Sequence, residues 1–86
     1  MAIARPASKK QHRIEELQRI ILDRFPDARF QVTPAPDARG VTAIWTYSTA
    51  DVEELSDTVR DREFEIMMTD GIHISVIPMP LEAYRG

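Results

Sequence analysis

Cysteine is absent from this 86-residue chain, and histidine occurs only twice, at His12 and His73. The missing thiols exclude a disulfide framework and any thiolate metal or redox site. A zinc site would therefore need carboxylates or a second chain to complete its ligands. We expect no cofactor, and the lack of cysteine fits a reducing, cytoplasmic setting.

Long apolar runs and glycine-rich loops are also missing. No uninterrupted apolar segment approaches the roughly 20 residues that a membrane-spanning helix needs. Residues 1–7 lack the apolar region of a secretory signal peptide, so we expect no membrane partner. The chain has only three glycines and offers neither a nucleotide-binding glycine loop nor a nucleophile–base pair. We therefore expect that the protein is not an enzyme.

The length predicts one small domain, organised as a flexible tail at 1–8, an α+β domain at 9–78 and an extended tail at 79–86. A chain of this size buries only about 60–65% of the surface that its unfolded form exposes, which leaves a thin stability margin. Without disulfides or a metal, oligomerisation is an attractive source of further stability.

The segment from Ala50 to Asp70 is the longest without proline or glycine, and it predicts the central helix. At 100° per residue, one side of this helix carries an apolar stripe, formed by Val52, Leu55, Val59, Ile66 and Met67. Thr49 or Asp51 is suited to the N-cap position, and Gly71 to the residue after the helix.

Glu63, Phe64 and Met68 depart from that pattern. Glu63 points into the stripe, and two interpretations are open. Either its stem packs at the margin while its carboxylate reaches solvent or an arginine, or the carboxylate is buried and has a raised pKa, as in functional sites. Phe64 and Met68 point off the stripe together, so they cover either a neighbouring helix of the same chain or a second subunit.

A second helix is predicted from Lys9 to Phe25, with Ser8 as N-cap and Pro26 as the terminating residue. Its core positions repeat with helical spacing at Ile14, Leu17, Ile21 and Phe25. Alternating segments predict strands at 28–33, 41–48 and 72–77, with a loop at 34–40. Pro78 and Pro80 are expected to end the last strand.

The resulting order is helix, strand, strand, helix, strand. It predicts an α+β two-layer sandwich, with a three-stranded mixed sheet and two helices on one face. The first two strands form an antiparallel hairpin, and the second and third run parallel through a right-handed crossover. The last strand lies beside either the second or the first. This order is similar to that of the type II K-homology RNA-binding fold, although the family's Gly-x-x-Gly loop is absent between Gly40 and Gly71.

The alternation assigns a face to each strand residue. We expect the helices to cover Phe30, Val32, Val41, Ala43, Trp45, Ile72, Ile74 and Val76. The open side then carries Arg29, Gln31, Thr33, Thr42, Ile44, Thr46, His73, Ser75 and Ile77. Such a face is solvated, packs against a second copy, or binds nucleic acid. An inverted register in the second strand would instead make Trp45 and Tyr47 a stacking platform.

Charge is distributed unevenly within a net charge of −3. Basic residues dominate the first third, at Arg5, Lys9, Lys10, Arg13, Arg19 and Arg24, whereas the central helix is acidic. Two helices of opposite sign lying side by side would explain this distribution. The alternative is two separate electrostatic faces for partners.

Together these features predict a small non-catalytic interaction module whose partner is a second copy or another protein. We expect a homodimer formed through the open sheet face or the Phe64/Met68 ridge. The candidate interface residues are Ile44, Thr46, His73, Ser75, Ile77, Phe64 and Met68. The alternative is an RNA-binding domain that uses its basic first helix, with Lys9, Lys10 and Arg13 as phosphate contacts. A third hypothesis is an enzyme subunit whose site needs a second chain.

Overall fold

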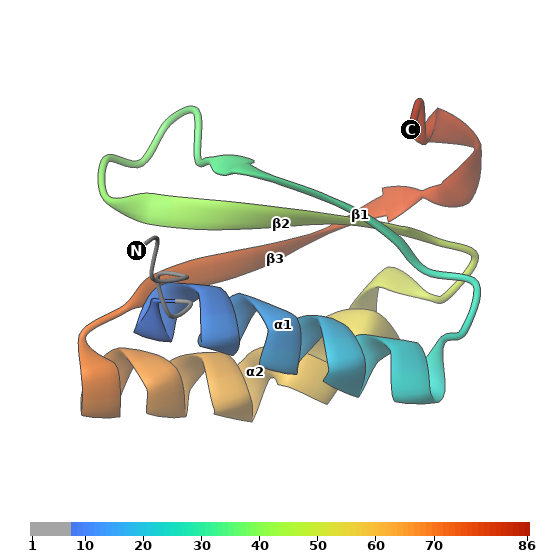
Figure 1. The fold of residues 1–86 in the computed structure, drawn as a ribbon. Coiled ribbons are helices and arrows are strands. Elements are labelled where there is room, and N and C mark those ends of the chain that lie inside the picture. The colour runs from blue at the N-terminus through green and yellow to red at the C-terminus, as the bar shows by residue number, and fades with distance from the viewer. Residues whose placement is uncertain (1–7) are drawn as a thin grey trace, which may run out of the picture.

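Helices and strands follow one another as α1 (Lys9–Arg24), β1 (Arg29–Pro34), β2 (Val41–Ser48), α2 (Val52–Asp70) and β3 (His73–Pro80). The structure is a computed structural model that describes residues 8–86, so residues 1–7 of the expected N-terminal tail lie outside the described part. Both helices lie on one face of the three-stranded mixed sheet (Figure 1), which confirms the predicted fold class.

The helix ends follow the predicted capping residues. The Ser8 side chain accepts a backbone N–H of the first turn of α1, and the Asp51 side chain does the same for α2. α1 stops at Arg24, directly before the cap residue Phe25 and Pro26. Gly71 ends α2 with a φ of 67°, a left-handed conformation that glycine adopts without steric cost.

The strand order in the sheet is β1-β2-β3, so the last strand lies beside the second. β1 pairs antiparallel with β2, and β2 pairs parallel with β3. β2 is therefore the central strand, and β1 and β3 are the two edges of the sheet.

β3 is longer than expected, because it runs through Pro78 to Pro80 rather than ending at Ile77. The Val76 N–H donates to the Glu63 carboxylate at 2.7 Å and so points away from β2. Alternate residues of a strand share this direction, which means that the proline nitrogen at Pro78 also points outward. No ladder hydrogen bond is lost, and an edge strand tolerates proline in such positions.

The C-terminal residues also differ from the predicted extended tail at 79–86. A short 3₁₀ helix, η1 (Leu81–Ala83), follows β3 directly. It turns the chain back so that the Tyr84 ring lies against the Tyr47 ring of the central strand.

The hydrophobic core lies between the helices and the sheet. Its buried members come from both helices, the α1–β1 connection, β2 and β3: Ile14, Leu17, Ile21, Phe25, Ala28, Ile44, Leu55, Val59, Ile66 and Ile74. The predicted apolar stripes of α1 and α2 supply most of them, but Val52, which was expected in the α2 stripe, is 59% exposed.

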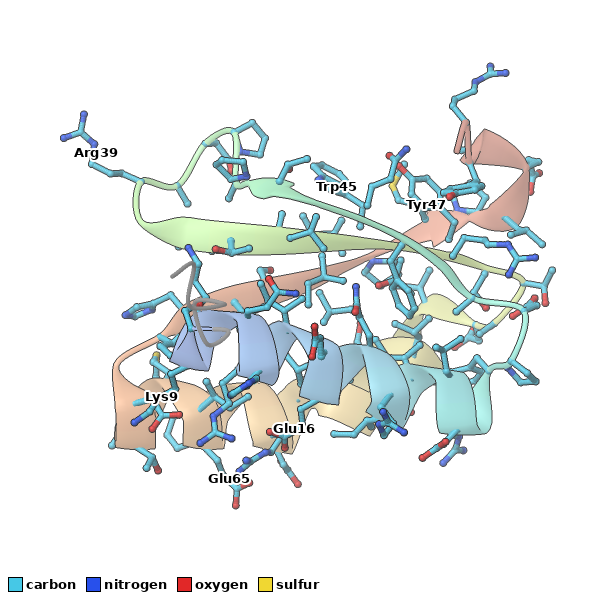
Figure 2. All side chains as sticks on the ribbon, viewed as in Figure 1. Lys9, Glu16, Arg39, Trp45, Tyr47 and Glu65 are labelled. Carbon is cyan, nitrogen blue, oxygen red and sulfur yellow. The ribbon has the colours of Figure 1, made fainter. Side chains whose placement is uncertain are left out.

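The predicted orientation of β2 is wrong. Ile44 and Thr46 have no exposed surface and lie on the helix-covered side, whereas Trp45 and Tyr47 lie on the open side (Figure 2). β1 and β3 have the predicted orientation, since Phe30 and Ile74 pack toward the core, but Val32 is 42% exposed and is not covered by the helices as expected. Only the central strand is inverted.

The pairing and polar groups of β2 account for this inversion. Phe30 is opposite Thr46 and Ile74 is opposite Thr42, so the side chains that face the helices alternate between large and small across the sheet. On the open side, the Trp45 indole N–H donates to Thr33 at 2.8 Å. The Tyr47 hydroxyl likewise donates to Gln31 at 2.9 Å. Both aromatic rings therefore keep hydrogen-bond partners that the apolar core does not offer.

Candidate interaction surfaces

The side of the sheet away from the helices is the first candidate surface, here called the open face. It consists of Arg29, Gln31, Thr33, Val41, Ala43, Trp45, Tyr47, His73, Ser75, Ile77 and Met79. None of these side chains is acidic, and only Arg29 and His73 are basic. The face thus joins aromatic, aliphatic and small polar groups with little net charge.

One end of the open face is covered by the chain itself. The ring centroids of Tyr47 and Tyr84 are 5.3 Å apart, and Tyr47 keeps only 7% of its surface exposed. Trp45 is therefore the only ring of the expected Trp45–Tyr47 platform that remains partly exposed. A single exposed ring offers one stacking position rather than the successive positions that single-stranded nucleic acids use.

The predicted interface residues of the sheet divide into two groups. His73, Ser75 and Ile77 lie on the open face as expected. Ile44 and Thr46 were expected there too, but both are fully buried under the helices and have no surface to offer a partner. Met79 belongs to the open face although it was assigned to the tail. Its position two residues after Ile77 could have indicated this, because alternate residues of a strand share a face.

The second candidate surface is the ridge formed by Phe64 and Met68 on α2. These side chains are 58% and 67% exposed, so more than half of each is left uncovered by the described part of the chain. Asp57 and Asp61 precede them at helical spacing and share this side of the helix. The ridge is consequently apolar at one end and acidic at the other.

The seam between α1 and α2 contains the ion pairs that the opposite helix charges suggested. The Arg13 guanidinium lies 2.7 Å from the Asp70 carboxylate, and Lys9 lies 3.6 Å from the same group. Asp70 is 5% exposed, and its hydrogen bond from Arg13 lowers the pKa of this carboxyl below its ordinary value.

A second arginine–carboxylate pair extends the seam. Arg62 of α2 binds Glu16 of α1 through two guanidinium nitrogens, and Glu16 also accepts from Arg13. The hydrogen bond from Arg62 lowers the pKa of Glu16. The helices of opposite sign thus lie side by side (Figure 1), and two of the three candidate phosphate contacts, Lys9 and Arg13, are paired within the chain; Lys10 is exposed.

Glu63 has a role that neither sequence interpretation described. Its carboxylate accepts the outward N–H of Val76, the edge-strand donor noted above. Burial raises the pKa of Glu63 above its ordinary value of 4.5, in the direction expected for a buried carboxylate. The carboxylate therefore protects the β3 edge against pairing with another strand.

A pocket of about 290 Å³ lies beside Glu63, between α2 and the start of β3. This α2–β3 groove is lined by Val41, Arg60, Glu63, Phe64, Met67, His73 and Ile74. Its walls are mainly apolar, and Glu63 is its one carboxylate. The groove continues the exposed ridge toward the sheet, because Phe64 belongs to both.

Within residues 8–86, no group of three histidine, aspartate or glutamate side chains is placed to hold a metal ion. Neither described helix is both long enough and apolar enough to cross a bilayer. No family model matches the chain, and neither a curated protein nor a solved structure shows significant similarity to it.

Proposed function

We propose that the protein is a small non-catalytic interaction module in which two copies associate by packing their open faces together. The observation that supports this most is the chemistry of the open face, which presents Trp45, Ile77 and Met79 without a single carboxylate. A two-fold contact packs the same face of both copies together, so a face with little charge avoids like-charge repulsion.

The ridge is less suited to self-association. A two-fold contact centred on Phe64 and Met68 is limited to these two side chains, and in a parallel arrangement of the helices it would bring Asp57 and Asp61 of both copies together. Arg60 offers little compensation, because it lies 2.7 Å from Asp57 and is already paired with it. Like charges held together in this way oppose binding.

The size of the open face predicts a weak dimer. Three strands of up to eight residues give it an outline of roughly 14 by 26 Å, from about 4.8 Å between strands and about 3.3 Å per residue. The two outlines together cover about 730 Å², which is below the roughly 1,200–2,000 Å² buried in standard specific interfaces, so the contact is small. We therefore expect dissociation in the micromolar range rather than a permanent dimer.

Sedimentation equilibrium across a concentration series tests this proposal. The wild type is expected to show a monomer–dimer equilibrium, and Ile77→Lys is expected to be monomeric because it places a charge beside Trp45 within the contact. Met68→Lys is the matched control, since it adds the same charge on the ridge and leaves the open face intact. A wild type that stays monomeric at high micromolar concentration would refute the self-association.

RNA binding through the first helix has less support. Lys9 and Arg13 are held by Asp70, so phosphate binding would have to break these ion pairs. A gel shift with mixed RNA sequences at low salt tests this alternative. Salt-sensitive binding that is lost in Lys10→Ala would favour it over the interaction module.

A further inference from the structure

The α2–β3 groove combines an apolar wall with one carboxylate. Phe64, Met67 and Ile74 supply the apolar surface, and Glu63 supplies the charge. The other titratable lining groups are Arg60, which is paired with Asp57, and the exposed His73. Arg60 forms its salt bridge with Asp57, and its charge also acts on the ionised Glu63 carboxylate against the larger effect of burial. Within residues 8–86, no salt bridge neutralises Glu63.

Only one oxygen of the Glu63 carboxylate is committed. Oε2 accepts the Val76 N–H at 2.7 Å, and no hydrogen bond from residues 8–86 reaches Oε1. An ionised carboxylate accepts several hydrogen bonds, so Oε1 retains the capacity to bind a donor. Burial also disfavours the charged form of this group, and a cation bound at Oε1 would offset that effect.

The neighbouring edge strand offers few N–H donors to an added strand. The outward Val76 N–H is taken by Glu63, and Pro78 and Pro80 have no N–H to donate. Extended peptides that add to a sheet need a row of such donors. The groove is thus suited to a side chain that enters between α2 and β3.

We propose that the α2–β3 groove binds a lysine or arginine side chain of a partner protein, with the cation on Oε1 of Glu63 and the aliphatic stem along Phe64 and Met67. Long basic side chains combine an apolar stem with a charged end, which matches this wall and carboxylate. The exposed Phe64 ring adds a favourable face for the cation. Asp61 on the same side of α2 favours a basic segment around the inserted residue, whereas Asp57 is already paired with Arg60.

This binding goes beyond self-association and does not depend on it. The groove shares only Val41 and His73 with the open face and uses neither Trp45 nor Ile77. A monomeric Ile77→Lys variant is therefore expected to bind the basic side chain as well as the wild type does. Retained binding in that variant separates the two proposals.

An NMR titration with N-acetyl-lysine methylamide and N-acetyl-arginine methylamide tests the groove, with the uncharged N-acetyl-norleucine methylamide as ligand control. The two basic probes are expected to shift the Val76 amide and Phe64 ring signals in a saturable manner. Glu63→Gln is expected to weaken binding at least tenfold, a change equivalent to 1.4 kcal/mol. Glu65→Gln, an exposed acidic position on the same helix, is expected to change binding less than twofold.

Three results would overturn the proposal: no saturable shift with either basic probe, equal binding of the norleucine probe, or equal effects of Glu63→Gln and Glu65→Gln. The amide spectrum of Glu63→Gln shows whether that variant keeps the fold. Phe64→Ala provides a second variant, because its side chain is mostly exposed and its loss leaves the core intact. It is expected to weaken both basic probes several-fold, and unchanged binding would contradict the assigned pose.

Discussion

Replacing isoleucine by alanine at two positions tests the observed orientation of the central strand. Ile44 lies under the helices and is fully buried, whereas Ile77 lies on the open face and is partly exposed. The alternation of the sequence placed both residues on the same face, so it predicts similar effects for the two substitutions. The structure predicts very different ones.

The magnitudes follow from burial. Removing a fully buried isoleucine side chain down to alanine costs about 2–5 kcal/mol, because both apolar contacts and packing around the new cavity are lost. At Ile77 the same change removes methyl and methylene groups, each of which contributes about 0.8 kcal/mol when fully buried. Because Ile77 is partly exposed, the expected loss of stability is only about 1 kcal/mol.

The larger loss is comparable to the whole stability of a small domain. A chain of 86 residues is expected to have a free energy of unfolding of about 4–13 kcal/mol, from about 0.05–0.15 kcal/mol per residue. Ile44→Ala therefore shifts the unfolding midpoint strongly or prevents folding. Ile44→Val, at about 0.5–1.5 kcal/mol, provides a milder change at the same position.

Urea unfolding measured by far-ultraviolet circular dichroism and by the fluorescence of Trp45, the single tryptophan, gives the free energies of all three variants. These measurements are made at low protein concentration, where the proposed dimer is dissociated. Equal losses for Ile44→Ala and Ile77→Ala, or a larger loss at Ile77, would refute the orientation of β2.

Three further substitutions have defined outcomes in the same unfolding assay. Glu63 has a raised pKa, so its protonated form stabilises the fold below pH 4.5, and this stabilisation is lost as the pH rises through the raised value. Glu63→Gln does not titrate, so its stability relative to the wild type should increase between pH 4 and pH 7. A difference in stability that does not change with pH would contradict this. Asp70 has a pKa lowered by Arg13, so its contribution to stability is present above pH 3.8 and is lost as the pH falls through the lowered value. Asp70→Asn should be less stable than the wild type at pH 7 and should lose less stability in acid. A loss of stability in acid equal to that of the wild type would contradict this. Thr46→Val removes a buried hydroxyl that donates to the Ile44 carbonyl at 3.2 Å, and a change larger than about 1 kcal/mol would mean that this hydrogen bond contributes more than expected.

The helices and their ends were predictable because their signals are local. Capping side chains at Ser8 and Asp51, a proline after α1 and Gly71 after α2 act through the nearest turn of backbone. The buried stripes of both helices follow a period that the sequence shows directly.

The orientation of β2 was not predictable from alternation alone. Ala43 on the open face is as fully buried as Ile44 on the helix side, so the central strand is buried on both faces. A strand buried on both sides lacks a polar face that would mark the solvent side. The size of Trp45 and Tyr47 suggested that these side chains face the core. They face the open side instead, where their polar atoms bind Thr33 and Gln31 of the neighbouring strand.

The groove depends on contacts that are distant in sequence. Glu63 reaches the β3 edge across 13 residues, and neither helical spacing nor strand alternation reveals that its carboxylate accepts the Val76 N–H. Pro78 was expected to end the strand because proline lacks an N–H for the sheet. The strand continues because β3 is an edge strand and the nitrogen of Pro78 points away from β2, which the sequence alone does not show. The exposure of Phe64 and Met68 could be predicted, since the two residues lie four apart and off the apolar stripe.

The central claim is that the open face, and not the ridge, is buried when two copies associate. Methyl-resolved NMR with a soluble paramagnetic probe tests it directly, by comparing a dilute sample with one well above the dissociation constant. We predict that Ile77 and Met79 lose contact with the probe at high concentration while Met68 stays equally accessible. Protection of Met68 with Ile77 unchanged would contradict the account.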